Sequence, residues 1–526
     1  MKLKMVLPMA FAMLGIACGI HAPAGAADLA IGMGFDIATL DPHFSNVTPN
    51  SVLAAHIFGR LVAFDSSRKL QPQLAESWKN IDDLTWEFKL RRGVKFHDGS
   101  ELTAEDVAYS FDRPATLVNS PSPFTMYTKA VTDKQIIDKY TIRFKTAAPY
   151  ALMLADAANI FILSKKATSG LSTEDFNAGK GMIGTGPYKF VQWQRGNRIE
   201  LVRNEAYWGT RPQWDKLTLR MITNAPARVA ALLAGDAQLI EGVPPADIAK
   251  LKGNPDLRLY STVSSRVIFL NLDQQRDVSP FITDKLGQPL GKNPLKDYKV
   301  RLAISKAINR PAIVDKVMEG DAIAAGQLLP PGFYGTAPGL KVETLDIEGA
   351  KKLLAEAGYP DGFGLTLHGT NDRYVNDAKI LQTIAQMLSR VGIAVKVDAM
   401  PLSVFFGRQN KLDFSMSMSG WGGGSGHPNT YLKGLVTSYN PPKGYGSNNI
   451  GRYSNSAVDA LVDQAFVTID PVKQEQLWQQ ATIIVIKQLG LVPLHYQMNV
   501  WAARKGYSYT PRADEWTLAY EAASVK

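Results

Sequence analysis

The stretch GWGGGSGHPN at residues 420–429 holds five glycines, one tryptophan and one histidine, residue types that serve at binding and catalytic sites. Backbone N–H groups at glycines can approach a ligand directly, tryptophan can stack on it, and histidine and asparagine offer donors and acceptors. The spacing matches neither G-x-G-x-x-G nor G-x-x-x-x-G-K-[ST], so it does not indicate a phosphate-binding loop. It predicts the floor of a binding pocket, with a surface turn whose tryptophan packs on the core as the alternative. The residues predicted to contact a ligand here are Trp421, Gly422, Gly423, Gly424, His427 and Asn429.

Patterns typical of catalysis or metal binding are missing elsewhere in the sequence. The seven histidines form no i, i+4 pair and have no ligand-spaced neighbour, so spacing indicates no metal site, although distant residues could still assemble one. No serine stands in G-x-S-x-G, which disfavours a nucleophile elbow. His97 and Asp98 could form a catalytic pair, but they precede a helix that Thr103 and Asp106 can cap, which favours a structural role. We therefore predict no enzymatic activity, no cofactor and no metal.

The N-terminus is typical of a secretory signal. Lys2 and Lys4 precede an apolar run over residues 5–20, and small residues at 24–26 fit cleavage after Ala26 or Ala27. The run is short for a membrane-spanning helix, which needs roughly 20 residues. Cleavage would also remove Cys18, the only cysteine. The sequence predicts a periplasmic protein, with a retained anchor or a lipidated Cys18 as alternatives.

The charge distribution argues against a nucleic-acid-binding protein, and the length predicts more than one lobe. The 58 Lys and Arg are scattered among 48 Asp and Glu, giving a formal charge of +10 without any block of five or six like charges. A nucleic-acid-binding protein would concentrate its basic residues on one stripe, so no nucleic acid is expected as a partner. A chain of 526 residues exceeds the roughly 250–300 residues of a single core, which predicts more than one lobe.

Helices and strands follow one another in mixed order. Apolar residues at 300, 303, 304, 307 and 308 define one helical face, and Pro311 restarts a second helix whose core face continues to Val317. Helices are also expected over 346–357 and 375–389, each leading into a strand, at 365–367 and 393–397. Strand patterns dominate from 184 to 272. This succession predicts an α/β fold with two lobes of different topology.

Several strings carry a resemblance over nearly the whole chain. They are TLDPH (39–43), QLAESW (73–78), WEFKLRRGVKFHDGSELTAEDVAYSFDR (86–113), GTGPYKF (184–190), RNEAYWG (203–209), VRLAISKAINRPAIVDKV (300–317) and LLAEAGYPDG (353–362). Through these strings the chain resembles the solute-binding proteins of bacterial ABC importers of the peptide/nickel type, the family 5 oligopeptide- and dipeptide-binding proteins. The resemblance implies a monomer that captures a peptide or peptide-like solute in the periplasm. It would deliver this solute to an inner-membrane permease and its ATPase subunits.

The resemblance also implies a domain organisation, that of a type II periplasmic-binding-protein clamp of the large class. An extra subdomain then belongs to the first lobe, and strands cross between the lobes. The predicted segments are 1–27 for the signal peptide, 28–60, 185–270 and 491–526 for lobe I, 61–184 for the extra subdomain, and 271–490 for lobe II.

Ligand-contacting positions can be transferred from the family by position. Peptide binders carry a Trp-Gly-x-Asp segment whose Asp pairs with the peptide's α-amino group, but here Gly424 stands in place of that Asp, and residues 414–458 contain no acid. An ammonium group would need another partner, such as Asp372 or a backbone carbonyl, because a buried charge without a counter-charge is costly. Arg373 and Arg408 could bind a carboxylate. The further predicted contacts are Ser45, Asn46, Val47, Thr48, Phe269, Asn271, Asp372, Arg373, Tyr374 and Arg408.

The missing acid leaves four ligand classes and one other activity open. A blocked peptide, a peptide-like metabolite or another neutral or anionic solute would fit a pocket without that carboxylate. The same clamp could hold a metal chelate. A periplasmic hydrolase acting on peptides is the alternative from a different class, although it would need a nucleophile–base pair or a metal that the sequence does not reveal.

Overall fold

The computed structural model describes residues 28–422 and 426–525. The predicted signal peptide, Cys18 and two of the pocket glycines, Gly423 and Gly424, lie outside the described residues. Within the described ranges, no helix combines the length and apolarity needed to cross a membrane.

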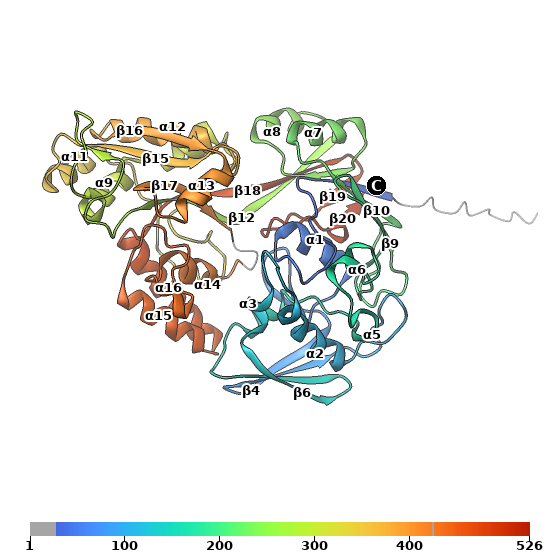
Figure 1. Cartoon of the computed structure of the whole chain (residues 1–526). Coiled ribbons are helices and arrows are strands. Elements are labelled where there is room, and N and C mark those ends of the chain that lie inside the picture. The colour runs from blue at the N-terminus through green and yellow to red at the C-terminus, as the bar shows by residue number, and fades with distance from the viewer. Residues whose placement is uncertain (1–27, 423–425, 526) are drawn as a thin grey trace, which may run out of the picture.

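A single 12-stranded sheet runs through both halves of the molecule, in the order β13-β15-β17-β12-β18-β11-β1-β10-β9-β8, with β14 on β18 and β16 on β15. Two long strands, β12 and β18, pass from one lobe to the other (Figure 1). The molecule is therefore the predicted two-lobed α/β clamp. The strands are β1 (Asp28–Met33), β8 (Tyr188–Gln194), β9 (Arg198–Arg203), β10 (Lys216–Met221), β11 (Leu239–Glu241), β12 (Leu257–Leu272), β13 (Ile282–Thr283), β14 (Ala322–Ala324), β15 (Gly364–Thr370), β16 (Ala394–Met400), β17 (Met416–Trp421) and β18 (Val492–Arg504).

In lobe II, β15 runs parallel to both β16 and β17, and helices cover this part of the sheet (Figure 1). The predicted apolar face over 300–308 is confirmed, because all five of its residues are buried in the lobe II core. The predicted second helical segment also extends to Val317, but only its first three residues are α-helical and the rest forms a π-helix. The helices here are α9 (Tyr298–Ala307), α10 (Arg310–Ala312), η3 (Ile313–Val317), α11 (Ile347–Glu356), α12 (Asp377–Ser389) and α13 (Leu402–Gln409).

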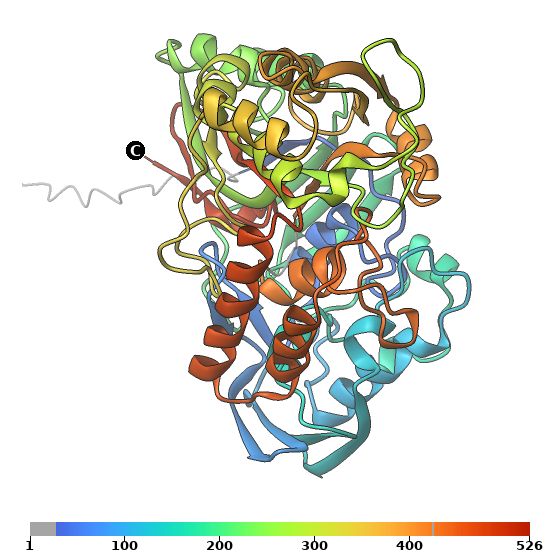
Figure 2. The same ribbon diagram turned by 90° about the vertical axis from the view of Figure 1, so that its left-hand side faces the viewer.

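A second helical layer of lobe II lies beside the small subdomain of lobe I (Figure 2). It consists of α14 (Pro428–Tyr431), η4 (Leu432–Val436), α15 (Ser456–Val467) and α16 (Pro471–Lys487). Its contact with the other lobe includes a backbone hydrogen bond of 3.2 Å from the Ala151 N–H to the Phe466 carbonyl. Ile469 also packs against the core of the subdomain.

The small subdomain has its own four-stranded antiparallel sheet and its own core. A capping box between Thr103 and Asp106 begins its helix, as the sequence predicts. His97 bonds the Gly186 carbonyl through Nε2 at 3.1 Å, and Asp98 accepts from Ser100, so both have structural partners. The elements are β4 (Ala75–Asp82), β5 (Thr85–Leu90), β6 (Val131–Asp138), β7 (Thr141–Thr146), α2 (Ala104–Asp112), α3 (Thr125–Thr128), α4 (Met153–Ala157), α5 (Lys165–Thr168) and α6 (Thr173–Asn177).

The rest of lobe I surrounds β1, which pairs in parallel with β10 and β11. The chain's C-terminal segment returns here, so lobe I is built from separate parts of the sequence. The exact lobe and subdomain boundaries stay a prediction. The remaining elements are α1 (Thr48–Ile57), α7 (Ala225–Ala234), α8 (Pro245–Lys252), β2 (Val62–Phe64), β3 (Leu70–Pro72), β19 (Tyr507–Tyr509) and β20 (Ala522–Ser524).

The crossing strands are irregular at the place where the lobes meet. Val263 pairs with Met498 and Val267 with Tyr496, so three residues of β12 stand opposite one residue of β18. Such a bulge bends a strand and frees backbone groups from the ladder. Here the Ser265 N–H donates to the lobe I carbonyl of Ala513 (3.1 Å), and its carbonyl accepts from the lobe II hydroxyl of Tyr431 (2.5 Å). The bulge is thus bonded to both lobes.

Candidate ligand-binding cleft

A cavity of about 1300 Å³ lies at this junction and is lined by both lobes and both crossing strands. It exceeds the roughly 300–1,000 Å³ of ordinary small-molecule pockets, and therefore has room for a solute of peptide size. Seven of the predicted contacts line it: Asn46, Val47, Thr48, Arg373, Tyr374, Trp421 and Gly422.

The lobe I loop before α1 contributes three of these residues. Asn46 holds the loop in place, because its backbone N–H donates to the Ser122 carbonyl (2.8 Å) and its Nδ2 donates to the Tyr127 hydroxyl (2.9 Å). Thr48 follows as the first residue of α1. Val47 is 40% exposed and provides an apolar surface toward the cleft.

Trp421 ends β17 on the opposite side of the cleft and is half-buried. Its backbone pairs with Val267, and its ring packs against the buried cluster that contains Tyr431. The indole Nε1 has no hydrogen-bond partner among the described residues. A ring fixed by packing in this way suits stacking on a ligand.

The glycines flanking Trp421 leave space for two side chains of the cleft. A Cβ at Gly420 would lie 2.7 Å from the Tyr374 ring, and one at Gly422 would lie 3.0 Å from the guanidinium carbon of Arg266. The Tyr374 hydroxyl also donates to the Gly420 carbonyl at 3.1 Å. These two glycines are therefore explained by side chains of the protein itself.

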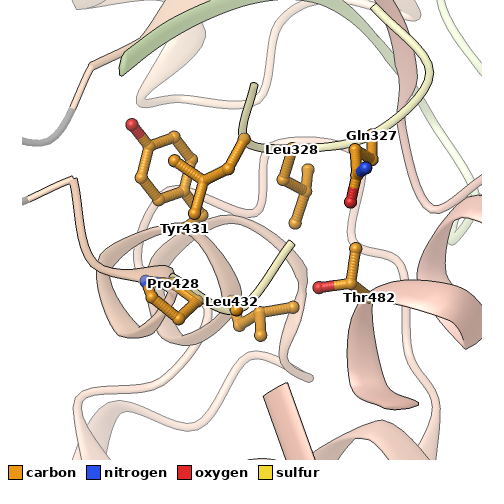
Figure 3. A pocket seen from close by; sticks show the side chains of 8 residues that line it. Gln327, Leu328, Pro428, Tyr431, Leu432 and Thr482 are labelled. Atoms are coloured by element: carbon orange, nitrogen blue, oxygen red, sulfur yellow. The ribbon is translucent and has the colours of Figure 1, made fainter. Parts of the chain in front are cut away.

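Below this loop, α14 is anchored firmly in lobe II (Figure 3). Pro428, Tyr431 and Leu432 pack against Leu328 and Thr482 and leave no room for a water molecule. The downstream end of the glycine-rich loop is therefore held by a close-packed core.

An ion pair that sequence reasoning missed lies in the cleft. Arg266 donates to both carboxylate oxygens of Glu515, through Nε and Nη2, at 3.0 Å each, and Ser264 donates to the same carboxylate at 3.0 Å. Burial alone would raise the pKa of Glu515, but the charge and hydrogen bonds of Arg266 hold this pKa below its usual value. The pair links the bulge of β12 to the C-terminal segment of lobe I.

Arg373 is exposed in the cleft, and no carboxylate among the described residues lies within ion-pair distance of it. Its guanidinium lies 5.3 Å from the centre of the Tyr374 ring. Partial burial and the neighbouring charge of Arg266 lower its pKa. Arg373 can therefore bind an anionic group of a ligand, and a bidentate pair with a carboxylate is the favoured geometry.

The remaining predicted contacts of the glycine-rich loop region have partners within the protein. His427 packs against Tyr334 and Trp478, and burial lowers its pKa to about 4. The Asn429 Oδ1 accepts from Nδ1 of the His427 ring at 2.8 Å. Neither residue lines the cavity, so their contact with a ligand stays a prediction.

Five other predicted contacts also lie outside the cavity lining, and each has a structural position. Ser45 is buried and bridged to Ser122, and Phe269 is buried in a core cluster. The carboxylate of Asp372 accepts from the Leu402 N–H, and the buried Asn271 donates to Ser419 Oγ. Arg408 lies 3.5 Å from both Asp398 and Asp413.

Known proteins with the same architecture match the chain over most of its length. The model of the family described as bacterial extracellular solute-binding proteins, family 5 Middle, matches residues 69–443. The glutathione-binding protein GsiB of Salmonella choleraesuis is 31% identical over 509 residues, 94% of this chain and of that protein. The chain thus belongs to family 5 of the bacterial extracellular solute-binding proteins.

Solved structures agree with this assignment. The ABC transporter-associated periplasmic binding protein DppA from Helicobacter pylori, in complex with the peptide STSA, matches with a TM-score of 0.75 and 26% identity, over 95% of this chain and 99% of that one. HbpA2 from Haemophilus parasuis, at 24% identity, shares the fold with a TM-score of 0.80, over 95% and 100% of the two chains. The predicted resemblance is confirmed: the chain is the solute-binding component of an ABC importer.

The described residues contain no group of three or more His, Cys, Asp or Glu placed to hold a metal ion. The charged residues that line the cleft are Arg228, Arg266, Arg373, Glu241, Asp321 and Glu515.

Proposed function

We propose that the chain captures a peptide-like solute in the periplasm and delivers it to an inner-membrane permease with its ATPase subunits. Glutathione leads the candidate ligands, because the 31% identical relatives are glutathione-binding proteins. The observation that carries the proposal is the cleft between the lobes, which has room for a tripeptide and contains Arg373 without a carboxylate partner among the described residues.

Closure of the lobes would turn binding into a signal for the permease. A ligand shifts an open–closed equilibrium only through contacts that differ between the two states. Arg373 of lobe II and the Asn46 loop of lobe I line the same cavity, so a solute that fills it can contact both lobes at once. In this proposal the chain is a monomer, is secreted through a cleaved signal peptide, and leaves the covalent bonds of its solute intact.

Calorimetric titration of the mature protein with glutathione tests this function, after unfolding and refolding to remove any co-purified solute. We expect one binding site per chain and unchanged glutathione in the mixture by mass spectrometry. The dipeptide Met-Leu and a nickel–histidine complex serve as competing ligands. Tighter binding of the nickel complex would favour the chelate alternative, and cleavage products would favour the hydrolase.

Removing the Trp421 side chain should weaken binding. Trp421→Ala is expected to reduce the affinity for glutathione by ~1–3 kcal/mol, the scale of a lost aromatic contact. Trp421→Phe, which keeps a ring, should lose less. The control is Trp193→Ala, since Trp193 lies in β8, outside the cleft lining. Equal affinities of wild type and Trp421→Ala would show that this ring does not contact the solute.

A further inference from the structure

Asp321 lines the cleft, but its carboxylate takes part in none of the contacts described above. It follows η3 and directly precedes β14, and its backbone N–H donates to the Met318 carbonyl at 2.8 Å. The next residue, Ala322, pairs with Gln497 of the crossing strand β18, which also lines the cleft. The position of Asp321 is therefore fixed by the sheet, and its half-buried side chain lines the cavity.

Among the described residues, the carboxylate of Asp321 has neither a hydrogen-bond donor nor a cation as a partner. The other two acids of the cavity lining are both engaged. Glu515 pairs with Arg266, and Glu241 accepts from the Gly34 N–H (2.7 Å) and from the Thr517 hydroxyl. Asp321 is thus the one uncommitted carboxylate among the described residues that line the cleft.

This arrangement is unfavourable while the site is empty. Burial raises the pKa of Asp321 to about 6, and no charged group contributes to the shift. The carboxylate is still ionised at neutral pH, where it lacks both full hydration and a counter-charge, a combination that costs free energy. A cationic group of the ligand would remove this cost on lobe closure.

The cleft also needs such a carboxylate if its solute is a peptide with a free amino group. Residues 414–458 contain no acid. Asp372, the replacement considered from the sequence, does not line the cavity and accepts from the Leu402 N–H at 2.8 Å. Asp321 supplies the missing negative charge from a different segment of lobe II.

We propose that Asp321 pairs with the ammonium group of the bound solute while Arg373 binds a carboxylate, so that the cleft selects zwitterionic, amino-acid-like ligands. The inference rests on the proposed function, because it assigns the two ends of the solute that the cleft captures. It also narrows the ligand class, since solutes without a cationic group would leave Asp321 uncompensated.

The test compares glutathione with Nα-acetylglutathione, which lacks the ammonium group, by calorimetry on the refolded full-length mature protein. Asp321→Asn is expected to weaken glutathione binding by about 10- to 100-fold, the scale of a lost charge-assisted hydrogen bond. The acetylated compound should bind wild type weakly, and the substitution should leave that affinity unchanged. Glu319→Gln is the matched control, because it removes a negative charge only two residues from Asp321. The Glu319 side chain is exposed and lies outside the cleft lining.

The outcomes separate this inference from the function on which it rests. If wild type binds glutathione and Asp321→Asn binds it equally well, the ammonium has another partner and the inference is wrong, while the function stands. An equal loss for both ligands would likewise overturn it, since it would indicate a structural role for Asp321. Failure of wild type to bind any tested peptide would overturn both. Thermal melts of each variant exclude misfolding as the cause of a loss.

Discussion

Asp41→Asn is expected to lower the free energy of unfolding by about 3–5 kcal/mol, the scale of breaking a buried ion pair from one side. The carboxylate of Asp41 receives both terminal nitrogens of Arg113 at 2.7 Å, and the two side chains are 0% and 4% exposed. The backbone N–H of His43 and the hydroxyl of Thr173 donate to the same group. The substitution leaves the guanidinium buried without its counter-charge.

The pH dependence of stability gives this prediction a second readout. Burial would raise the pKa of Asp41, but the hydrogen bonds and charge of Arg113 lower it overall, below its ordinary value of 3.8. A group with a lowered pKa contributes stability above that ordinary value, and the contribution is lost as pH falls through its folded pKa. The stability difference between wild type and Asp41→Asn should therefore be largest near neutral pH and shrink below about pH 4.

Urea unfolding followed by circular dichroism at pH 7 and at pH 3 measures both effects. Asp83→Asn is the control, because Asp83 is exposed and has no partner among the described residues. A loss for Asp41→Asn no larger than that for Asp83→Asn at pH 7 would contradict the assigned role of the pair. A difference that persists unchanged at pH 3 would show that the substitution acts through packing and not through charge.

The Asp41–Arg113 pair also shows that two of the strings shared with the family stabilise the fold and do not contact a ligand through these residues. Asp41 belongs to the TLDPH string, and Arg113 ends the long string of the small subdomain. The ion pair joins these two segments beneath the loop that lines the cleft at Asn46. The string at 86–113 therefore ends in a structural ion pair.

Patterns that depend on chain neighbours predicted the scaffold well. The helical face over 300–308 is buried as expected, because its side chains fall on one side of α9 and of the turn that follows. The strand expected within 184–272 at positions 267–270 forms part of β12, whose inner residues are buried on both sides. In each case a short segment contains the whole signal, namely the spacing of its apolar residues.

The charges of the cleft could not be predicted in the same way. Arg266 and Glu515 are 249 residues apart, and the bulge of β12 that brings them together leaves no mark in the composition. Asp321 stands in an ordinary loop between a turn and a short strand. Trp421 lines the cleft, and its contact with a ligand stays a prediction that rests on a local signal, an aromatic ring among glycines.

Glycines illustrate the same limit. The sequence predicts that Gly422 contacts a ligand. Gly422 lines the cleft, and Gly420 and Gly422 also leave space for the side chains of Tyr374 and Arg266. Only the three-dimensional structure shows which neighbour approaches a residue without a side chain. Gly184, in the GTGPYKF string, offers a direct test of this point away from the cleft.

Gly184→Ala is expected to destabilise the protein by about 3 kcal/mol or more, because overpacking against a rigid neighbour forces the backbone to move. A Cβ at this position would lie 1.9 Å from the Ile57 carbonyl oxygen and 2.7 Å from its carbon. The neighbouring backbone is fixed in place, since the Gly186 N–H donates to the same oxygen at 2.8 Å and the His97 N–H donates to the Gly184 carbonyl at 2.8 Å.

Gly407→Ala is the matched control, because it makes the same chemical change at a helical glycine in α13 where an added Cβ meets nothing within 4 Å. That substitution should stabilise the protein by ~0.5–1 kcal/mol, the helix-propensity difference between the two residues. If Gly184→Ala lowers and Gly407→Ala raises the free energy of unfolding, the close approach of the backbone at Gly184, and not the loss of a glycine as such, causes the destabilisation. A small or stabilising effect of Gly184→Ala would mean that α1 can move away from the 184–186 turn, and the Asn46 loop that precedes α1 in the cleft would then be mobile as well.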